Sequence, residues 1–337
     1  MATIKEIAYK CKVSTATVSK ALHNSKELPA STIERVRRAA EKMGYVPNAS
    51  ARALINKKSR LIGVLFVDNT DWGMKHEFFS SILEAIRVEA ERQDYSFCFL
   101  SHNLSREKPM SYLESARYRG LDGVVIVSAD FKSKEIISLV ESEIPCVTID
   151  YVFNNSTAIM SDNFDGLKSL TEYLISLGHK RIAFLHGEET DVTKKRLAGY
   201  VSALTEAGLA VDRSIVIPAI YHDPKTSGRI TYDLMSKPDR PTCLIYPDDV
   251  SMIGGISAIG KAGLRIPDDV SVAGFDGVNL SRIMRPVFTT FVQPANELGR
   301  LSAQKLIDRI ENPATFIPEV ITLNGVVQKG GTAAKAK

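Results

Sequence analysis

Residues 3–22 read TIKEIAYKCKVSTATVSKAL, and this stretch predicts two short helices joined by a tight turn. Thr3 and Glu6 have the spacing of a capping box, which satisfies the first backbone N–H groups of a helix. Apolar residues then recur at helical spacing, at Ile4, Ile7, Ala8 and Cys11. Lys12 begins the turn, and Ser14 can cap the second helix. This arrangement is typical of a helix-turn-helix.

The second helix carries a run of small and polar side chains. They are Thr15, Ala16, Thr17, Ser19 and Lys20. Such residues allow a helix to lie in the DNA major groove and reach base edges. A third helix is expected to end near Gly44. It begins either at Pro29 or at a capping box formed by Ser31 and Glu34. A generic three-helix bundle explains this periodicity equally well.

The next segment, YVPNASARAL at residues 45–54, favours DNA binding. It is too short to be a stable helix alone, so it can fold only against a partner. Leu54 is a large apolar side chain suited to unstacking a base step in the minor groove. Residues 1–60 hold 13 Lys/Arg and four Glu, a net charge of +9, whereas residues 61–337 hold 30 Lys/Arg and 35 Asp/Glu, a net charge of −5. This asymmetry predicts a polyanionic partner for the head alone.

The composition is that of an ordinary globular protein. The chain has 337 residues, of which 44% are hydrophobic and 24% charged. The apolar runs are far shorter than the roughly 18 residues of a membrane helix, and the polar N-terminus does not resemble a secretory signal. The four cysteines form no CxxC pair, which favours free thiols. We therefore expect a cytoplasmic protein with no membrane partner.

From residue 61 onward, apolar strands alternate with amphipathic helices, which predicts an α/β fold with parallel sheets covered by helices. The predicted strands are Leu61–Val67, Tyr95–Leu100, Asp122–Val127, Cys146–Ile149, Arg181–Leu185, Cys243–Tyr246 and Val270–Phe275. The predicted helices are Phe78–Arg92, Phe164–Leu177, Val192–Ala207, Val250–Ala262 and Ala295–Ile310. A segment of this length fits two lobes with a cleft better than one lobe.

Polar residues follow several predicted strands, where open α/β sheets bind their ligands. The aspartates at these positions are Asp68, Asp150, Asp248 and Asp276. Arg196 and the loop aromatics Trp72, Phe78 and Tyr221 complete the candidate set. Carboxylates and an arginine bind hydroxyls, and aromatic rings cover the apolar face of a sugar. A helix-capping or turn role is a serious alternative for Asp68, and a weaker one for Asp150 and Asp276.

Catalysis is disfavoured because the chain carries no nucleophile or phosphate-binding motif in its required context. Residues 255–261 match GxxxxGK, but Ala262 replaces the required Ser or Thr and the match lies inside a predicted helix. The histidines show no metal-ligand spacing, so we expect no metal and no cofactor. Three hypotheses remain: a ligand-gated transcription regulator, a sugar-binding carrier or sensor that does not bind DNA, and a phosphosugar or nucleoside enzyme. The basic head argues against the second.

The runs IKEIAYKCKVSTATVSKAL and GYVPNASARAL resemble the DNA-binding head and hinge of the LacI/GalR repressors. The resemblance extends over nearly the whole chain. Further matching runs are GHKRIAFLHG (178–187), RLAGY (196–200), PDD (247–249), IPDDVSVAGFD (266–276) and TTFVQP (289–294). The combined signal is very specific, although no single run is.

The resemblance implies DNA contacts for ten residues: Ser14, Thr15, Ala16, Thr17, Ser19, Lys20, Tyr45, Asn48, Ala51 and Leu54. Leu54 matches the intercalating leucine. Lys20 stands where Arg is common, and it lacks the planar fork that grips guanine. Lys12 stands where Gly or Asn is frequent, and a left-handed backbone would cost it roughly 1 kcal/mol. Both departures leave the operator sequence open.

The resemblance also implies a helix-turn-helix domain (1–46), a hinge helix and linker (47–59), a two-lobed periplasmic-binding-protein-like domain (60–330) and a flexible tail (331–337). Lobe 1 would comprise 60–160 and 291–321, and lobe 2 would comprise 161–290 and 322–330. Effector contacts carry over to Phe78, Asp150, Arg196, Tyr221, Asp248, Asp276 and Gln293. Many members have Asn at the position of Asp248.

The expected protein is thus a homodimeric repressor of a carbohydrate-utilisation operon. It would bind a palindromic, double-stranded operator and respond to a small-molecule effector, with a sugar as the first choice. A purine- or nucleoside-responsive regulator, or one co-repressed by a phosphoprotein, is the alternative. The C-terminal GGTAAKAK has no heptad repeat, which argues against a coiled-coil tetramer.

Overall fold

The computed structural model describes residues 2–22, 27–45, 58–68, 72–101 and 109–337. The chain forms two compact units, Met1–Ser59 and Arg60–Lys337, which are considered separately below.

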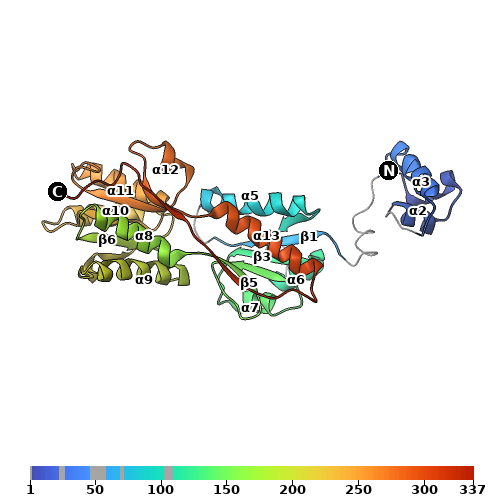
Figure 1. Ribbon diagram of the computed structural model, residues 1–337, viewed down its shortest axis with the longest axis horizontal. Coiled ribbons are helices and arrows are strands. Elements are labelled where there is room, and N and C mark those ends of the chain that lie inside the picture. Colours follow the sequence, from blue (N-terminus) through green and yellow to red (C-terminus); the bar gives the residue numbers. More distant parts are fainter. Residues whose placement is uncertain (1, 23–26, 46–57, 69–71, 102–108) are drawn as a thin grey trace. The chain divides into compact units, whose positions relative to one another are not determined.

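The first unit contains the helices α1 (Ile4–Cys11), α2 (Thr15–Leu22) and α3 (Ala30–Lys42) (Figure 1). The expected capping box is present, because the Thr3 Oγ1 accepts the Glu6 N–H at 3.3 Å and the Glu6 carboxylate accepts the Thr3 N–H at 2.8 Å. Lys12 adopts the left-handed conformation with φ 51°, which permits the abrupt turn. Ser14 Oγ accepts the Thr17 N–H at 3.0 Å at the start of α2. The two helices of the predicted motif are therefore present.

The helix α3 begins directly after Pro29, and not at the alternative capping box of Ser31 and Glu34. Pro29 is the N-cap residue, and its fixed φ suits the first turn. Glu34 instead bonds Arg38 one turn later, at 2.7 Å. The core of this unit is formed by fully buried side chains from all three helices, at Ile7, Val18, Ala21 and Val36.

The second unit contains two six-stranded sheets. The first has the order β11-β5-β4-β3-β1-β2, and its neighbouring strands are parallel. Its strands are β1 (Leu61–Phe66), β2 (Ser96–Phe99), β3 (Gly123–Ser128), β4 (Cys146–Ile149), β5 (Thr157–Ser161) and β11 (Val320–Leu323). The helices α5 (Glu77–Arg92) and α13 (Ala295–Glu311) cover one face, while α6 (Tyr112–Arg119) and α7 (Lys134–Val140) cover the other.

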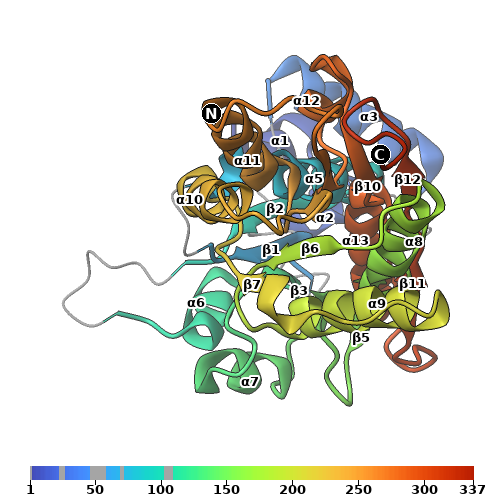
Figure 2. The ribbon, with the colours of Figure 1, turned by 90° about the vertical axis from the view of Figure 1, so that its left-hand side faces the viewer.

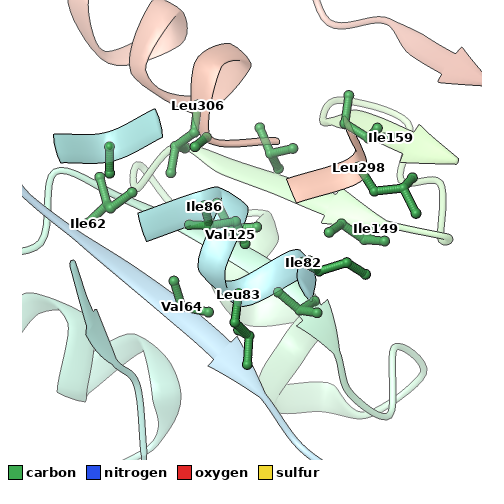
Figure 3. Close-up of a cluster of buried hydrophobic side chains, with 14 of the residues drawn as sticks. Ile62, Val64, Ile82, Leu83, Ile86, Val125, Ile149, Ile159, Leu298 and Leu306 are labelled. Carbon is green, nitrogen blue, oxygen red and sulfur yellow. The ribbon is translucent and has the colours of Figure 1, made fainter. Parts of the chain in front are cut away.

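Figure 3 shows the core beneath α5 and α13, where aliphatic side chains of two helices and four strands interdigitate. Ile82, Ile86 and Leu298 are fully buried there. Ile82 and Ile86 are four residues apart on α5, so they belong to the apolar stripe that packs on the sheet. This core fixes the start of α5, which carries part of the candidate site.

The second sheet has the order β12-β10-β9-β8-β6-β7, with only β12 antiparallel. Its strands are β6 (Ile182–His186), β7 (Val216–Pro218), β8 (Cys243–Ile245), β9 (Ser271–Asp276), β10 (Thr289–Val292) and β12 (Val326–Gln328). The paired helices α8 (Asn163–Ser176) and α9 (Asp191–Glu206) cover one face, and α10 (Pro224–Met235) and α11 (Asp249–Lys261) the other (Figure 2). Two short 3-10 turns, η1 (Gly73–Lys75) and η2 (Arg213–Ile215), and the helix α12 (Asn279–Ile283) lie in connections.

The chain passes between the two sheets three times. The passages follow β5, β10 and β11, so they lie between residues 161 and 163, 292 and 295, and 323 and 326. We expected them near 160, 290 and 322. Each sheet and the helices that cover it thus form one lobe. Three segments connect the lobes: two lead from a strand to a helix, and one leads from a strand to a strand.

The C-terminal segment is packed, so the expectation of a flexible tail at 331–337 is wrong. Thr332 and Ala333 are 1% and 8% exposed. Thr332 Oγ1 accepts the Thr289 N–H at 2.8 Å, and the Thr332 carbonyl accepts the Val272 N–H at 2.9 Å. The segment therefore adds backbone hydrogen bonds to the second lobe, which composition alone could not indicate.

No helix in the described ranges is long and apolar enough to cross a membrane. All four cysteines are free thiols, three of them buried.

Candidate functional site

A cavity of about 430 Å³ opens between the two lobes of the second unit. From the first lobe it is lined by residues that follow β1, β3 and β4, and by the start of α5. From the second lobe it is lined by residues that follow β6 and β9, by α9, and by the loop after β7. This is the edge of the sheets where the sequence predicted a ligand site.

Seven of the nine predicted effector residues line the cavity. They are Asp68, Phe78, Asp150, Arg196, Tyr221, Asp276 and Gln293. Trp72 and Asp248 are not among the lining residues.

Asp150 directly follows β4 and Asp276 ends β9, and both are in the left-handed region, with φ 57° and 101°. Such conformations are costly for residues other than glycine and concentrate at functional sites. Asp150 Oδ1 accepts the Ser161 N–H at 2.7 Å. Burial raises the pKa of Asp150 to about 6, although this hydrogen bond acts in the opposite direction. Asp276 Oδ1 accepts Gln293 Nε2–H at 2.6 Å, which orients its other oxygen.

Arg196 is 5% exposed and is held rigidly in α9. Its Nε donates to Asn163 Oδ1 at 2.8 Å, and one Nη donates to the Pro247 carbonyl at 2.9 Å. Its guanidinium carbon lies 3.7 Å from the centre of the Phe275 ring. These contacts use two of the five N–H donors, so the rest can serve a ligand.

Asp248 does not line the cavity, so the structure gives no support to its predicted direct contact with the effector. Asp248 caps α11, where its carboxylate accepts the Ser251 N–H at 2.7 Å. It also accepts the His222 N–H at 2.8 Å, and thereby fixes a residue that does line the cavity. Burial alone would raise the pKa of Asp248, but the donors from His222 and Ser251 lower it to about 2. Asp248 is therefore a positioning residue.

The prediction for Trp72 is also not supported, because the η1 turn brings other aromatic residues to the cavity. Phe78 and Phe79 line it from the first turn of α5, with their rings 5.2 Å apart. Trp72 precedes η1 and is partly buried. The η1 turn between β1 and α5 was not predicted from the sequence pattern.

Sequence reasoning missed an aromatic pair in the cavity wall. Phe131 and Tyr151 stack with ring centres 4.6 Å apart and planes inclined by 4°. Each follows a strand end, after β3 and β4 respectively, and both line the cavity. Their position two or three residues beyond a strand was the available signal.

The cavity wall is strongly acidic. Among the residues that the structure describes, its carboxylates are Asp68, Asp130, Asp150, Glu188, Glu189, Asp191 and Asp276, and its permanent cations are Lys132 and Arg196. Seven carboxylates against two cations disfavour an anionic ligand. Hydroxyl groups, which donate hydrogen bonds to carboxylates, suit this wall.

In the first unit, Ser14, Thr15, Ala16 and Lys20 are exposed, and Thr17 and Ser19 are partly exposed. Lys20 forms an ion pair with Glu27. Tyr45 packs against the three-helix core. Asn48, Ala51 and Leu54 lie outside the described residues, so their predicted DNA contacts remain predictions.

Two family models match the chain. Residues 3–48 match "Bacterial regulatory proteins, lacI family", and residues 59–324 match "Periplasmic binding proteins and sugar binding domain of LacI family". The HTH-type transcriptional repressor PurR of Pasteurella multocida (strain Pm70) is 32% identical over 314 residues, covering 92% of each chain. The probable HTH-type transcriptional repressor ExuR of Bacillus subtilis (strain 168) is 31% identical over 329 residues, covering 95% of each.

Solved structures share the fold. The lac repressor dimer bound to operator and the anti-inducer ONPF has a TM-score of 0.84 at 24% identity, covering 99% of each chain. A LacI family transcriptional regulator from Enterococcus faecium with bound ribose has a TM-score of 0.72 at 27% identity, covering 82% of this chain and 100% of its own.

Proposed function

The chain belongs to the LacI family of bacterial regulatory proteins, and from this premise we propose that it represses transcription by binding a palindromic operator as a homodimer. The charge of +9 on residues 1–60 supports a DNA partner for the first unit. The exposed residues Thr15, Ala16 and Lys20 on α2 support major-groove reading. A two-fold dimer would present two such helices to two half-sites, and it would act in the cytoplasm, where the operator lies.

The effector is a neutral sugar in this proposal, and the wall of the cavity is the observation that carries it. The wall combines an excess of carboxylates with the aromatic rings of Phe78, Phe131 and Tyr151. Carboxylates accept hydrogen bonds from hydroxyls, and the rings cover the apolar face of a pyranose or furanose. The described family includes a sugar-binding domain, and a relative in the solved structures holds ribose.

The effector acts by changing the relative population of open and closed lobes. A ligand shifts this equilibrium only by its difference in affinity for the two states. Residues of both lobes line the cavity, so a bound sugar favours closure. Closure then changes the affinity for the operator. The operator changes the affinity for the effector by the same factor, because the coupling free energy between two binding sites is reciprocal.

Calorimetric titration of the full-length protein tests the effector class. The panel contains neutral mono- and disaccharides, the matching uronic acids, and purine bases. Saturable binding of a neutral sugar that changes operator affinity is the expected result. Binding confined to uronic acids would contradict the argument from wall charge. Binding confined to purines would favour the alternative regulator, in which Phe131 and Tyr151 stack on a base.

The variant Arg196→Lys tests the assigned effector site. It keeps the charge but loses the planar fork that holds Asn163 and Pro247. We expect effector affinity to fall at least about tenfold while operator affinity without effector is retained, because a misplaced polar anchor costs about 1–3 kcal/mol. Arg181→Lys is the control, since Arg181 pairs with Asp212 and Asp239 away from the cavity. Equal losses in both variants would contradict the assigned site.

A further inference from the structure

Three buried side chains from distant parts of the chain meet beside the cavity. His76 immediately precedes α5 in the first lobe, His222 lies between β7 and α10 in the second, and Asp276 ends β9. They are 1%, 8% and 7% exposed. One potential ligand atom from each lies within 4.8 Å of those of the other two. Both His222 and Asp276 line the cavity.

The imidazole of His76 has no hydrogen-bond partner for either ring nitrogen among the residues that the structure describes. Its ring centre lies 3.7 Å from that of His222, and its Nε2 lies 3.7 Å from Asp276 Oδ2, beyond hydrogen-bond distance. Buried polar groups almost always have partners, so an imidazole in this state requires an explanation. The rings of His76 and His222 and the Asp276 Oδ2 atom thus lie against one another, with no hydrogen bond to the His76 ring from any described residue.

We propose that His76, His222 and Asp276 bind one divalent transition-metal ion of the Zn²⁺ class. Two imidazoles and one carboxylate are a donor set that Zn²⁺ accepts, with bonds of about 2.0–2.2 Å. In a tetrahedral site two such ligand atoms lie about 3.4 Å apart. The ligand atoms of the three residues already lie within 4.8 Å of one another, and the two imidazoles would turn so that one nitrogen of each points at the ion.

The surroundings hold two of the three ligands in suitable orientations. Asp248 Oδ2 accepts the His222 backbone N–H and lies 3.5 Å from His222 Nδ1, so it can orient the imidazole through that nitrogen. Carboxylates next to ligating histidines play this role in zinc sites. Gln293 occupies Asp276 Oδ1, so that Oδ2 faces His76.

A metal at this position would connect the lobes, because His76 belongs to one and the other two ligands to the second. The three protein ligands leave a coordination position for water or for a hydroxyl of a molecule in the cavity. The ion would thus favour the closed arrangement of the lobes. Binding of Zn²⁺ by the free protein is measured without effector or DNA, so its outcome is independent of the proposed function.

The first test is calorimetric titration of the chelator-treated full-length protein with Zn²⁺. The proteins are the wild type, His76→Gln, His222→Gln and the control His186→Gln, whose ring bonds the Gly187 carbonyl outside the cluster. We expect one ion per chain with micromolar or tighter affinity. Each cluster variant should lose at least about tenfold in affinity, and the control should not. Unchanged affinity in both cluster variants, or no binding by the wild type, would overturn the proposal.

Co²⁺ provides a second measurement that does not depend on the variants folding. Co²⁺ bound by two imidazoles and a carboxylate in a four- or five-coordinate site has strong visible absorption, whereas octahedral Co²⁺ in water absorbs weakly. The wild type should gain the strong bands at one equivalent and lose them when Zn²⁺ is added. A spectrum like that of Co²⁺ in buffer would show that the cluster does not bind the ion.

Discussion

At Asp150 the fold places a carboxylate where its ionisation is unfavourable. Burial raises its pKa to about 6, against a usual value near 3.8. A group with a raised folded-state pKa contributes its full stability below its unfolded pKa and loses it as the pH rises through the folded value. As the pH rises from about 4 to about 6, the buried Asp150 therefore lowers the free energy of unfolding. Above about pH 6 this loss is complete, and it amounts to at most about 3 kcal/mol. The same charge is what a hydroxyl-bearing effector needs.

We predict that Asp150→Asn is more stable than the wild type at pH 7, by about 1–3 kcal/mol, with no gain at pH 4. Asn tolerates the left-handed conformation, and its Oδ1 can still accept the Ser161 N–H. Denaturant unfolding at the two pH values measures the difference. Asp130→Asn, on the exposed rim of the same cavity, is the control. A gain of equal size at both pH values would contradict the role of ionisation.

Lys20, on the helix that we propose reads DNA, is paired with Glu27 in the free protein. DNA must replace this partner before Lys20 can reach a base or a phosphate. Removing one exposed ion pair of this kind has only a small effect on the free energy, because solvent and salt screen it. We therefore predict that Glu27→Gln binds the operator roughly two- to fivefold more tightly, measured by fluorescence anisotropy at fixed salt.

The variant Glu34→Gln distinguishes the loss of the Lys20–Glu27 ion pair from the general loss of one negative charge. Glu34 is an exposed head residue that pairs with Arg38 on α3. If both variants gain equally, net charge alone accounts for the effect. A larger gain for Glu27→Gln supports the competition at Lys20.

Among the elements, the starts of α5 and α12 face each other across the two lobes. The Glu77 carboxylate at the first turn of α5 accepts the backbone N–H of Asn279, the first residue of α12, at 2.8 and 2.9 Å. An anion at a helix N-terminus is favourable because the first N–H groups have no partner within the helix. This contact joins the two lobes without a bound effector.

We predict that Glu77→Gln weakens effector binding by roughly two- to fivefold, because it reduces a contact of about 0.3–1 kcal/mol that joins the lobes and that we expect to break when they open. Calorimetry with a sugar that binds in the titration panel measures this loss. Glu84→Gln is the matched control, since Glu84 lies on the same helix and pairs with Arg87 on the surface. Identical affinities for Glu77→Gln and wild type would show that the contact does not contribute to closure.

Elements with a clear apolar run or helical period were predictable from the sequence, and elements without one were not. The helix expected at Phe78–Arg92 is Glu77–Arg92, and the strand expected at Cys146–Ile149 has these bounds. The strand β7 has three residues, and β5 mixes apolar residues with Thr157 and Ser161, so neither shows a clear period. Such strands form because a neighbouring strand pairs with them, which is a tertiary effect.

The candidate site was predictable to the extent that its residues follow strands. Asp150 and Asp276 do so, and both line the cavity. Asp248 does so as well, but its oxygens are used by the N–H groups of α11 and His222, which depends on the fold. His76 and His222 belong to different lobes, so no local spacing in the sequence could have paired them.

For the molecule as a whole, the proposed dimer requires both heads to contact one operator. Two half-sites on one face of the duplex must be separated by about one helical turn or a multiple, some 10–10.5 base pairs between centres. Inserting about five base pairs places the second half-site on the opposite face. A two-fold dimer then contacts only one half-site at a time, and the linked second binding event is lost.

We predict that the full-length protein binds such an inserted operator no more tightly than a single half-site, at least about tenfold more weakly than the intact palindrome. Titration of the three duplexes at one salt concentration measures this, since phosphate contacts make every affinity salt-dependent. Sedimentation of the free protein establishes whether it is already dimeric at the concentrations used. If the inserted operator binds as tightly as the intact one, the heads act independently, and the coupling from cavity to DNA must run within one chain rather than through the spacing of two heads.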